Sequence, residues 1–305
     1  MPSAAPGQVL IEVKAFGINH AEIYFRQGIW GDVAEISGIE CVGVVKDDPS
    51  GHLQTGQTVF ALVGGMGRSV DGSYAAYTVV PTSNVVAVDS ALDWTVLAAI
   101  PESYGTAWSC LHGNLAIRAG QTLLIRGATS ALGRAAVNIA AKLGAHVIAT
   151  TRKPERFADL RAIGAGNTLI EGDTLQAQMR DHYDDGVDAV LDLIGNSTIL
   201  ASLAMARRGG RVCQAGFLGS GGPLVQLEPV FDFPSERHLS VFASALVLGS
   251  AEFPLADIPF QRIVDEVERG YYRAAPAHVF EFDEIQAAHR LVESGLAHGK
   301  IVVRI

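Results

Sequence analysis

The spacing of apolar residues divides the chain into a β-rich first part, a middle part in which strands and helices alternate, and a short mixed end. Up to about residue 97, short apolar runs separated by glycines predict strands, and apolar residues at helical spacing are scarce. The five runs are residues 9–15, 38–45, 57–62, 73–80 and 85–88. Short strands of this kind predict a small antiparallel barrel or sandwich.

From residue 105 to about residue 248, apolar runs of strand length alternate with segments of helical spacing. The six predicted strands are residues 123–126, 147–150, 168–170, 189–193, 211–215 and 239–246. Six strands separated by helices match a doubly wound parallel sheet, so we predict an α/β fold. The end of the chain then predicts a βαβ-like unit after a further helix: helix 258–270, strand 279–282, helix 283–294 and strand 301–305.

The stretch from residue 121 to residue 156 predicts a strand, a glycine turn, a helix, a second strand and a basic loop. Apolar residues of the helix recur at helical spacing: Leu132, Ala135, Ala136, Ile139, Ala140 and Leu143. The unpaired backbone N–H groups and the dipole at the start of such a helix favour an anion such as a pyrophosphate. Gly127, Ser130 and Gly133 have the spacing of the dinucleotide-binding fingerprint, although Ser replaces its middle Gly.

The position of this turn favours a cofactor site over a glycine turn that only lets helix and strand pack closely. The turn follows a strand, opens a helix and lies in a βαβ unit of about 30 residues, as the fingerprint requires. Ser130 is small enough for the backbone to approach a phosphate, and its hydroxyl offers a further contact. The predicted phosphate-binding residues are Gly127, Ala128, Thr129, Ser130, Ala131, Leu132 and Gly133.

The loop after the second of these strands predicts NADP(H) as the cofactor. An NAD site normally offers an Asp or Glu to the ribose about 20 residues after the first glycine. This chain instead has Thr150 followed by Thr151, Arg152 and Lys153, which suit a 2′-phosphate and are predicted to bind it. One charge-assisted hydrogen bond contributes about 1.5–3 kcal/mol, which changes cofactor choice about ten- to a hundredfold. The alternative is that Arg152 and Lys153 only form the solvated start of the next helix.

Composition narrows the class of protein. With 305 residues, 49% of them hydrophobic, the chain can form two domains with ample core. The net charge of −9 and the scattered cations argue against nucleic-acid binding through a basic face. Apolar runs are too short to span a membrane and the first residues lack a signal-peptide pattern, so we expect a soluble, cytoplasmic protein with no membrane partner. Cys41, Cys110 and Cys213 are odd in number and far apart, which predicts small buried apolar residues.

Five short motifs are spread over nearly the whole chain. They are Gly17-Ile18-Asn19 followed by Glu22, Tyr24, Arg26 and Gly28; Gly38-Ile39-Glu40; Gly72-Ser73-Tyr74-Ala75; Gly105-Thr106-Ala107-Trp108; and Gly299-Lys300-Ile301-Val302-Val303. Together they resemble the medium-chain dehydrogenase/reductase superfamily, specifically its zinc-independent quinone oxidoreductase-like branch. The resemblance implies a GroES-like catalytic domain at residues 1–97 and 249–305 and a Rossmann NADP-binding domain at residues 98–248.

The same motifs argue against a zinc site. Asn19 stands where zinc-dependent relatives have Cys, and Ile39 stands where they have His. A catalytic zinc needs about three protein ligands and a structural zinc usually four thiolates. The chain keeps Glu40 but has no soft ligands around it, and His20 has no Cys partner at suitable spacing. We therefore predict no metal site.

Without a metal to polarise a carbonyl, the protein has to position the acceptor while NADPH delivers a hydride and a proton follows. Asn19 can hydrogen-bond a carbonyl, and Tyr24 can donate to it or position it; the resemblance places similar positions in the active site. The alternative for Tyr24 is an aromatic residue that only packs in the barrel. Arg26 is expected to brace its loop.

The resemblance and the expected topology add further cofactor contacts: Thr106 just before the Rossmann domain, Gly216 and Phe217 in the turn after the fifth strand, Phe242 and Ser244 on the sixth strand, and Lys300 near the end of the chain. For Lys300, a lysine that ends a strand is the alternative. Asp188 and Asp192 could act as acids or bases. For them we favour strand-end carboxylates that accept neighbouring backbone N–H groups.

Two edges of the predicted sheets need a partner. Relatives usually carry about 20 further residues before Pro6-Gly7, which form the first hairpin of the barrel, so we expect one barrel edge to be uncovered or differently covered. The sixth Rossmann strand is rich in apolar residues, and the resemblance implies a homodimer through it.

The predicted function is reduction of quinones, α,β-unsaturated carbonyls or other small carbonyl compounds by a zinc-independent, NADPH-dependent oxidoreductase. The alternative of another class is an NADPH-binding protein with little catalysis, in a sensor, crystallin-like or interaction role. Turnover of NADPH distinguishes the two.

Overall fold

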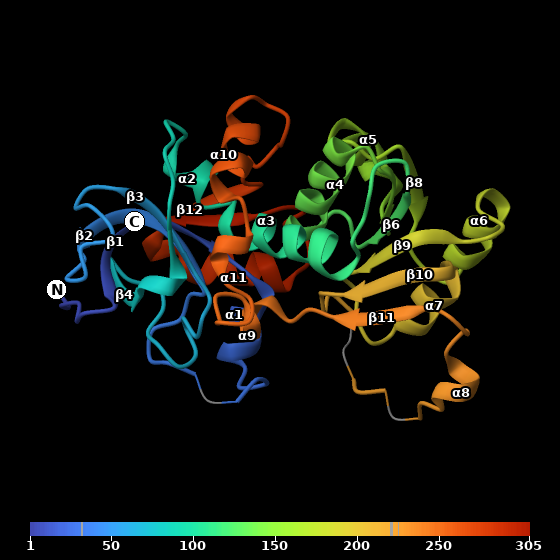
Figure 1. Cartoon of the computed structure of the whole chain (residues 1–305), viewed down its shortest axis with the longest axis horizontal. Coiled ribbons are helices and arrows are strands. Elements are labelled where there is room, and N and C mark those ends of the chain that lie inside the picture. Colours follow the sequence, from blue (N-terminus) through green and yellow to red (C-terminus); the bar gives the residue numbers. More distant parts are fainter. Residues whose placement is uncertain (32, 220–221, 225) are drawn as a thin grey trace. The chain divides into compact units, whose positions relative to one another are not determined.

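The computed structural model describes residues 1–31, 33–219, 222–224 and 226–305, and the chain forms two compact units. Unit 1 contains Met1–Thr106 and Ser244–Ile305, and unit 2 contains Ala107–Ala243. The chain therefore leaves unit 1 after Thr106 and returns to it at Ser244. In Figure 1 the colours follow this course, since the blue start and the red end of the chain both belong to unit 1.

Unit 1 is built on a seven-stranded sheet in the order β12-β13-β1-β2-β3-β5, with β4 beside β1. Its strands are β1 (Gln8–Ile18), β2 (Glu40–Asp47), β3 (Thr58–Leu62), β4 (Tyr77–Pro81), β5 (Val85–Ala87), β12 (His278–Glu281) and β13 (Ile301–Arg304). All pairs are antiparallel except β12 with β13. The antiparallel β-rich domain predicted from the glycine-punctuated apolar runs is confirmed.

The long strand β1 organises this sheet. Its first half pairs with β4, its second half pairs with β13, and β2 runs along its other side. Val9, Ile11, Val13 and Phe16 are fully or almost fully buried, because they reach the main apolar cluster of the unit. Such burial stabilises each large side chain by about 1.5–3 kcal/mol. The strand thereby fixes the position of Asn19, which directly follows it.

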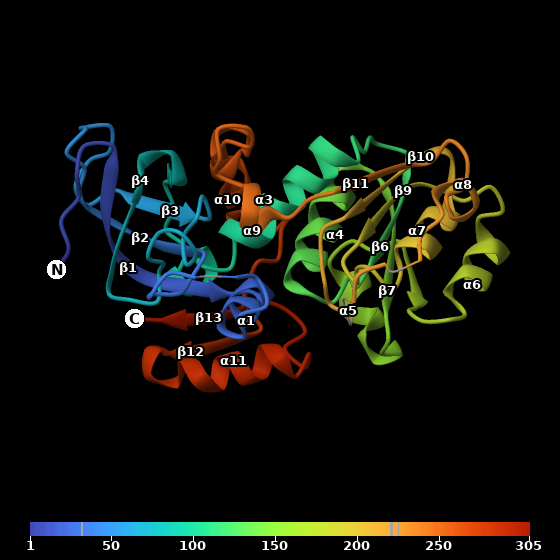
Figure 2. The same cartoon turned by 90° about the horizontal axis from the view of Figure 1, so that it is seen from below.

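The helices among the described residues of unit 1 are α1 (His20–Arg26), α2 (Trp94–Leu97), α3 (Pro101–Trp108), α9 (Ser244–Val247), α10 (Phe260–Glu268) and α11 (Ile285–Glu293), of which α3 continues into unit 2. Short 3-10 turns lie at Thr82–Asn84, Leu255–Asp257 and Phe282–Glu284. In α11 the buried residues Ala288 and Val292 are four apart and face the main cluster. Strand β12, helix α11 and strand β13 form the predicted βαβ unit, which is visible at the bottom of Figure 2.

Unit 2 is a six-stranded, fully parallel sheet in the order β11-β10-β9-β6-β7-β8. Its strands are β6 (Thr122–Arg126), β7 (His146–Thr151), β8 (Asn167–Ile170), β9 (Val187–Asp192), β10 (Ala206–Gln214) and β11 (His238–Val241). Its helices are α4 (Ala131–Leu143), α5 (Phe157–Ala162), α6 (Leu175–His182), α7 (Ile199–Met205) and α8 (Pro229–Asp232), with a π-helix at Ser109–Asn114 and a 3-10 turn at Pro154–Arg156.

This strand order is that of a doubly wound dinucleotide-binding sheet, as predicted. Helices α6 and α7 pack on one face through Leu175, Met179 and Leu203. Helix α4 turns its buried residues, among them Ala136 and Ile139, to β6 and β7. The turns that follow β6, β7, β9 and β10 therefore lie at the carboxyl ends of the strands, where such folds bind ligands.

The predicted sixth strand is too long. We expected residues 239–246 to be one strand, but β11 ends at Val241 and the backbone N–H of Phe242 makes the last contact, 2.9 Å from the carbonyl of Gln214. Ser244 then begins a helical turn, in which the N–H of Leu248 donates to its carbonyl at 2.9 Å. An apolar run alone does not distinguish one strand from a strand that continues into a buried turn. Phe242 and Ser244 therefore do not lie on a strand.

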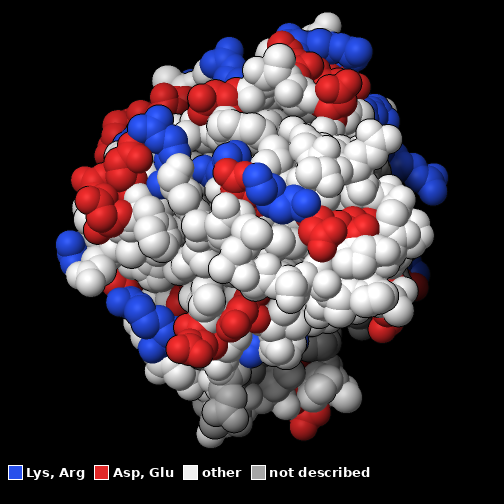
Figure 3. Space-filling view, turned by 90° about the vertical axis from the view of Figure 1, so that its left-hand side faces the viewer, with Lys and Arg blue, Asp and Glu red and all other residues white. Residues whose placement is uncertain are grey.

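The surface carries charges of both signs. On the face drawn in Figure 3, lysines and arginines lie next to aspartates and glutamates around a broad uncharged area. Ion pairs between exposed side chains include that of Arg304 with Glu281. Within the described part of the chain, no helix is both long and apolar enough to cross a membrane.

Candidate functional site

The turn between β6 and α4 has the geometry of a phosphate-binding turn. Gly127 has a φ of 75°, a conformation that favours glycine. Ser130 caps the helix: its Oγ accepts the N–H of Gly133 at 3.1 Å and donates to the carbonyl of Gly127 at 2.9 Å. A Cβ on Gly133 would lie 2.7 Å from the Cα of Ala128, so only glycine allows this packing. The hydroxyl of Ser130 thus serves the turn itself.

The start of α4 is open for an anion. Ala131 and Leu132 occupy the first two helical positions, and their N–H groups have no acceptor within the described ranges of the chain. Helix α4 is 13 residues long, so its dipole adds to the attraction for negative charge. A pyrophosphate fits this combination of glycine turn and open N–H groups.

The end of β7 carries no carboxylate. Thr151 is buried and its Oγ1 accepts the N–H of Lys153 at 3.1 Å, which shapes the loop. Arg152 is exposed, and its side chain makes no polar contact with any residue that the structure describes. Arg156, which follows one turn later, pairs with Asp159 at 3.1 Å. Arg152 is therefore a cation of this loop that remains available to a ligand.

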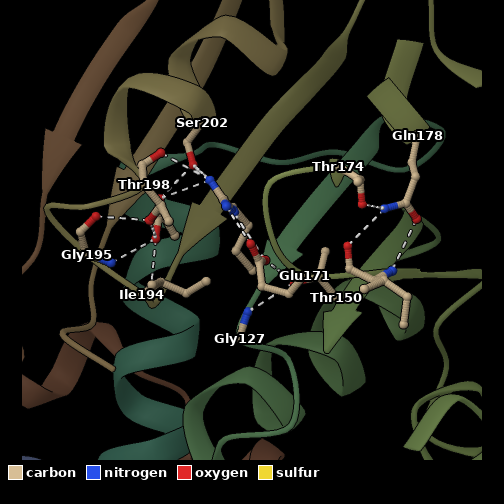
Figure 4. A network of polar contacts seen from close by, with 12 residues as sticks. Gly127, Thr150, Glu171, Thr174, Gln178, Ile194, Gly195, Thr198 and Ser202 are labelled. Atoms are coloured by element: carbon tan, nitrogen blue, oxygen red, sulfur yellow. Dashed lines mark hydrogen bonds and ion pairs between the residues drawn. The ribbon is translucent and has the colours of Figure 1, made fainter. Parts of the chain in front are cut away.

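A buried polar network lies at the carboxyl ends of the strands next to this turn (Figure 4). Arg126, the last residue of β6, is almost fully buried and binds Glu171, with its Nη2 at 2.5 Å and its Nε at 3.2 Å from the two carboxylate oxygens. Thr150 donates to Glu171 at 2.6 Å and accepts the N–H of Gly127 at 3.3 Å. A chain of contacts therefore connects β8 and β7 to the first residue of the phosphate turn.

The same arginine also reaches the other side of the turn. Its Nη1 donates to the carbonyl of Thr198 at 3.1 Å and to Ser202 at 3.0 Å. Ser202 in turn donates to Asp192 at 2.6 Å, and Asp192 accepts the N–H groups of Ile194 and Gly195 at 2.9 and 3.0 Å. Asp192 is thus a structural carboxylate at the end of β9.

Asp188 is also a structural carboxylate, because it accepts the N–H of Thr122 at 2.8 Å and pairs with Arg207. The expectation that Asp188 and Asp192 bind backbone N–H groups is therefore confirmed.

The sequence did not point to Arg126 and Glu171 as parts of the site. The available signal was a charged residue at the end of the buried run Thr122–Arg126, where an apolar residue is the rule.

The other predicted contacts of unit 2 lie after β10 and β11. The N–H of Ala215 donates to the carbonyl of Asp192 at 3.0 Å, and the next residue, Gly216, packs so closely on Leu193 that a Cβ would overlap its backbone. Phe217 follows in the same turn, and Phe242 is buried after β11. Their contacts with a cofactor stay predictions.

Two of the predicted residues of unit 1, Asn19 and Lys300, meet Glu40 in a second buried polar cluster. Lys300 places its Nζ 2.5 Å from Oδ1 of Asn19 and 2.5 Å from Oε1 of Glu40. The Nδ2 of Asn19 donates to the same oxygen of Glu40 at 2.9 Å. The second oxygen of Glu40 accepts the N–H of Glu102 at 2.8 Å. The side chains of Lys300 and Glu40 are 4% and 0% exposed, so this ion pair is shielded from water.

The carboxylate of Glu102 connects two further predicted residues. Its Oε1 accepts the hydroxyl of Thr106 at 2.9 Å and the hydroxyl of Ser244 at 3.1 Å. Thr106 and Ser244 are the residues at which the chain leaves and re-enters unit 1. Both hydroxyls are therefore bound within unit 1, and contacts of Thr106, Ser244 and Lys300 with a cofactor stay predictions.

Burial changes the protonation of this cluster. Burial raises the pKa of Glu22 to about 7, although the N–H groups of Ile39 and Asn19, at 3.1 and 2.8 Å, act in the opposite direction. Burial also raises the pKa of Glu102. For Lys300, burial alone would lower the pKa, but Glu40 and Glu102 offset it and the pKa is raised. The ammonium of Lys300 is therefore charged at neutral pH, while Glu22 is close to half protonated.

Tyr24 lies on α1. Its ring is half-buried and packs on Trp30 with the ring centroids 5.0 Å apart. Burial raises the pKa of its hydroxyl, so it remains protonated at neutral pH and can donate a hydrogen bond. The packing is therefore observed, and a donor role of this hydroxyl stays a prediction. Arg26, expected to brace a loop, is the last residue of α1 and pairs with Glu293, which ties α1 to α11.

The described residues contain no group of three or more His, Cys, Asp or Glu side chains that could hold a metal ion. The side-chain partners of the Glu40 carboxylate are the amide of Asn19 and the ammonium of Lys300, and an ammonium repels a cation. The residues present at this position do not fit zinc. All three cysteines are free and buried, as expected.

Comparison with known proteins identifies both units. The family model described as "Alcohol dehydrogenase GroES-like domain" matches residues 5–90, and the one described as "Zinc-binding dehydrogenase" matches residues 131–260. The quinone oxidoreductase of Homo sapiens is 23% identical over 315 residues, which cover 99% of this chain and 91% of that protein. The chain belongs to the medium-chain dehydrogenase/reductase superfamily, in its quinone oxidoreductase-like branch. The turn of unit 2 fits the nicotinamide cofactor of this superfamily.

Two further similarities are to a much larger protein and to a solved structure. The spectinabilin polyketide synthase system protein NorB of Streptomyces orinoci is 28% identical over 306 residues, but the chain spans only 13% of the length of that relative. The crystal structure of the Escherichia coli quinone oxidoreductase complexed with NADPH superposes with a TM-score of 0.85 at 20% identity, covering 100% of this chain and 94% of that one. This likeness establishes the fold.

Proposed function

We propose that the protein reduces quinones, α,β-unsaturated carbonyls or other small carbonyl compounds with NADPH and without zinc. Bound NADPH supplies the hydride. The observation that carries the proposal is that the chain has both an open phosphate turn in unit 2 and an amide donor, Asn19, which is held by Glu40. The resemblance places this asparagine where zinc-dependent relatives have a Cys ligand. The relatives named as quinone oxidoreductases support the reaction class.

The preference for NADPH is supported by the loop after β7. Arg152 is exposed and without a polar partner among the described residues, and a carboxylate that would repel a 2′-phosphate is absent from the end of β7. A contact between this guanidinium and a phosphate contributes about 1.5–3 kcal/mol, or about ten- to a hundredfold in affinity. Arg152→Ala should therefore lower the affinity for NADPH by this factor and leave NADH unaffected. Arg180→Ala, which removes an exposed cation on α6, is the matched control.

The experiment that tests the proposed reaction monitors NADPH oxidation by absorbance with four acceptors: an ortho-quinone, a para-quinone, an enone and a simple aldehyde. The protein is treated with chelator beforehand, and each assay is repeated with NADH. Turnover with NADPH well above NADH on a conjugated acceptor supports the proposal. Tight NADPH binding without turnover on any acceptor favours a cofactor-binding role instead.

We also propose that the protein forms a homodimer through β11. This strand is an edge of the parallel sheet, and Val241 at its end is 58% exposed. An uncovered parallel edge with an apolar end is a site at which a second copy can continue the sheet. Light scattering at micromolar concentration should give twice the mass of the chain, and a monomeric mass would refute the dimer.

A further inference from the structure

The side-chain amide of Asn19 is held at both of its ends. Its Oδ1 lies 2.5 Å from the ammonium of Lys300, and its Nδ2 lies 2.9 Å from the carboxylate of Glu40. An ammonium has only donors and an ionised carboxylate has only acceptors. The amide can therefore satisfy both neighbours in one orientation only, with its oxygen toward Lys300 and its nitrogen toward Glu40.

This orientation leaves one donor unused. The Nδ2 of an asparagine carries two hydrogens, and one of them goes to Glu40. The other has no acceptor among the residues that the structure describes, and Asn19 is only partly buried. The ammonium at Oδ1 also withdraws electron density from the amide, which strengthens its N–H as a donor.

We propose that Lys300 and Glu40 are positioning residues that make Asn19 a hydrogen-bond donor, rather than an acceptor, toward the carbonyl oxygen of the substrate. This inference rests on the proposed function. In the reduction of a conjugated carbonyl, negative charge develops on that oxygen when the hydride arrives, and a fixed donor lowers the barrier. A rotated amide would present its own oxygen and repel the same charge.

Two further contacts and a close approach of the backbone hold the donor in place. The backbone N–H of Asn19 donates to Glu22 at 2.8 Å, so the start of α1 is fixed. The second oxygen of Glu40 is bound to the N–H of Glu102, so the carboxylate cannot turn away. A Cβ at Gly17 would overlap the side chains of both Lys300 and Glu40, which explains why glycine occupies this position of β1.

The decisive variants separate positioning from stability. Lys300→Met leaves the carboxylate of Glu40 buried without its partner, which destabilises a protein strongly. Lys300→Met combined with Glu40→Gln removes both charges and should recover much of the stability. If the pair only stabilised the fold, activity would return with stability. If it orients Asn19, kcat remains reduced, because the two charges that select one orientation of the amide are then gone.

We expect the double variant to lose about 10²-fold in kcat, the usual effect of removing one donor to a developing oxyanion. Asn19→Asp, which replaces the N–H donor by an acceptor, should lose at least as much. In the Asn19→Asp background, adding Lys300→Met and Glu40→Gln should cost little more, because the residues act through the same group. Arg304→Met, which breaks an exposed ion pair on the same strand β13, is the matched control and should keep wild-type kcat.

A second readout does not depend on turnover. Hydrogen exchange of the side-chain amide of Asn19 can be followed by NMR in ¹⁵N-labelled protein. In the wild type, the amide proton bound to Glu40 should be protected from exchange with water, and the other proton on the same nitrogen should exchange quickly. The signal is assigned by its loss in Asn19→Asp. In the double variant this difference should disappear. Wild-type kcat in the double variant, or protection that persists in it, would overturn the inference. If the wild type reduces no acceptor, the proposed function is wrong, and the amide signals still decide the orientation.

Discussion

Replacing the buried carboxyl of Glu22 by an amide should change how the stability of the protein depends on pH. Glu22 is 0% exposed on α1, and burial raises its pKa from 4.5 to about 7. The folded protein therefore holds this proton more tightly than the unfolded chain does. As pH rises from 4.5 to 7, the unfolded chain gives up the proton first, so the stability contributed by protonated Glu22 is progressively lost.

The size of this effect is set by the rise in pKa. A pKa that rises from 4.5 to about 7 corresponds to about 3 kcal/mol, most of which is lost between about pH 5 and about pH 8. Glu22→Gln cannot titrate. At low pH, where wild-type Glu22 is protonated, the variant should be about 1 kcal/mol less stable than wild type, because the amide accepts only one of the two backbone N–H groups that Glu22 binds. The free energy of unfolding of the variant, relative to wild type, should therefore rise by up to about 3 kcal/mol from about pH 5 to about pH 8.

Urea unfolding at several pH values measures this difference, with tryptophan fluorescence as the signal. Trp30 packs on Phe25, with the ring centroids 5.8 Å apart, and so reports on α1. Hydrogen exchange at the N–H of Ile39, which Glu22 binds, locates the effect. Glu35→Gln, at an exposed position, is the control and should follow the wild type. Parallel stability curves for wild type and Glu22→Gln would refute the reasoning.

Three further predictions concern the phosphate turn. Gly133→Ala should weaken NADPH binding about tenfold or more in a calorimetric titration, because the added methyl group meets the backbone of Ala128; unchanged affinity would contradict the packing argument. Ser130→Ala should lower the unfolding free energy by about 1 kcal/mol through loss of the helix cap, measured by urea unfolding; an effect near zero would mean that the cap contributes nothing. Arg126→Met should destabilise the protein by about 3–5 kcal/mol, because Glu171 is left buried without its partner, and adding Glu171→Gln should restore much of this loss; no recovery in the double variant would show that the ion pair is not the cause.

Much of the fold could be predicted because local patterns carry it. The run before Gly127 and the apolar spacing after Ser130 define a strand and a helix by themselves, and the doubly wound order follows from the alternation of such elements. The end of β11 could not be predicted. The residues from Leu239 onward remain largely apolar when the chain leaves the sheet, and only the partner strand β10 determines where pairing stops.

The polar clusters were predictable only in part. Asn19 and Lys300 stood out as parts of motifs, but the sequence does not show that their side chains meet, since they are 281 residues apart. The same is true of Arg126 and Glu171, which are 45 residues apart, at the end of β6 and directly after β8. Contacts of this kind depend on the register and order of strands, which local periodicity does not contain.

The most direct test of the proposed reaction traces the hydride itself. The chelator-treated protein is incubated with NADPH that carries deuterium at C4 of the nicotinamide and with an enone or a quinone, and the reduced acceptor is analysed by mass spectrometry. For the enone we expect one deuterium on carbon in the product, delivered from one face of the nicotinamide only. For the quinone, a deuterium on oxygen would exchange with water, so the product carries no stable label. We expect instead one NADP⁺ per hydroquinone formed. This NADP⁺ keeps or loses its deuterium according to the face of the nicotinamide that carried the deuterium. NADPH that binds tightly but transfers no label to the enone and forms no NADP⁺ with the quinone would contradict the account.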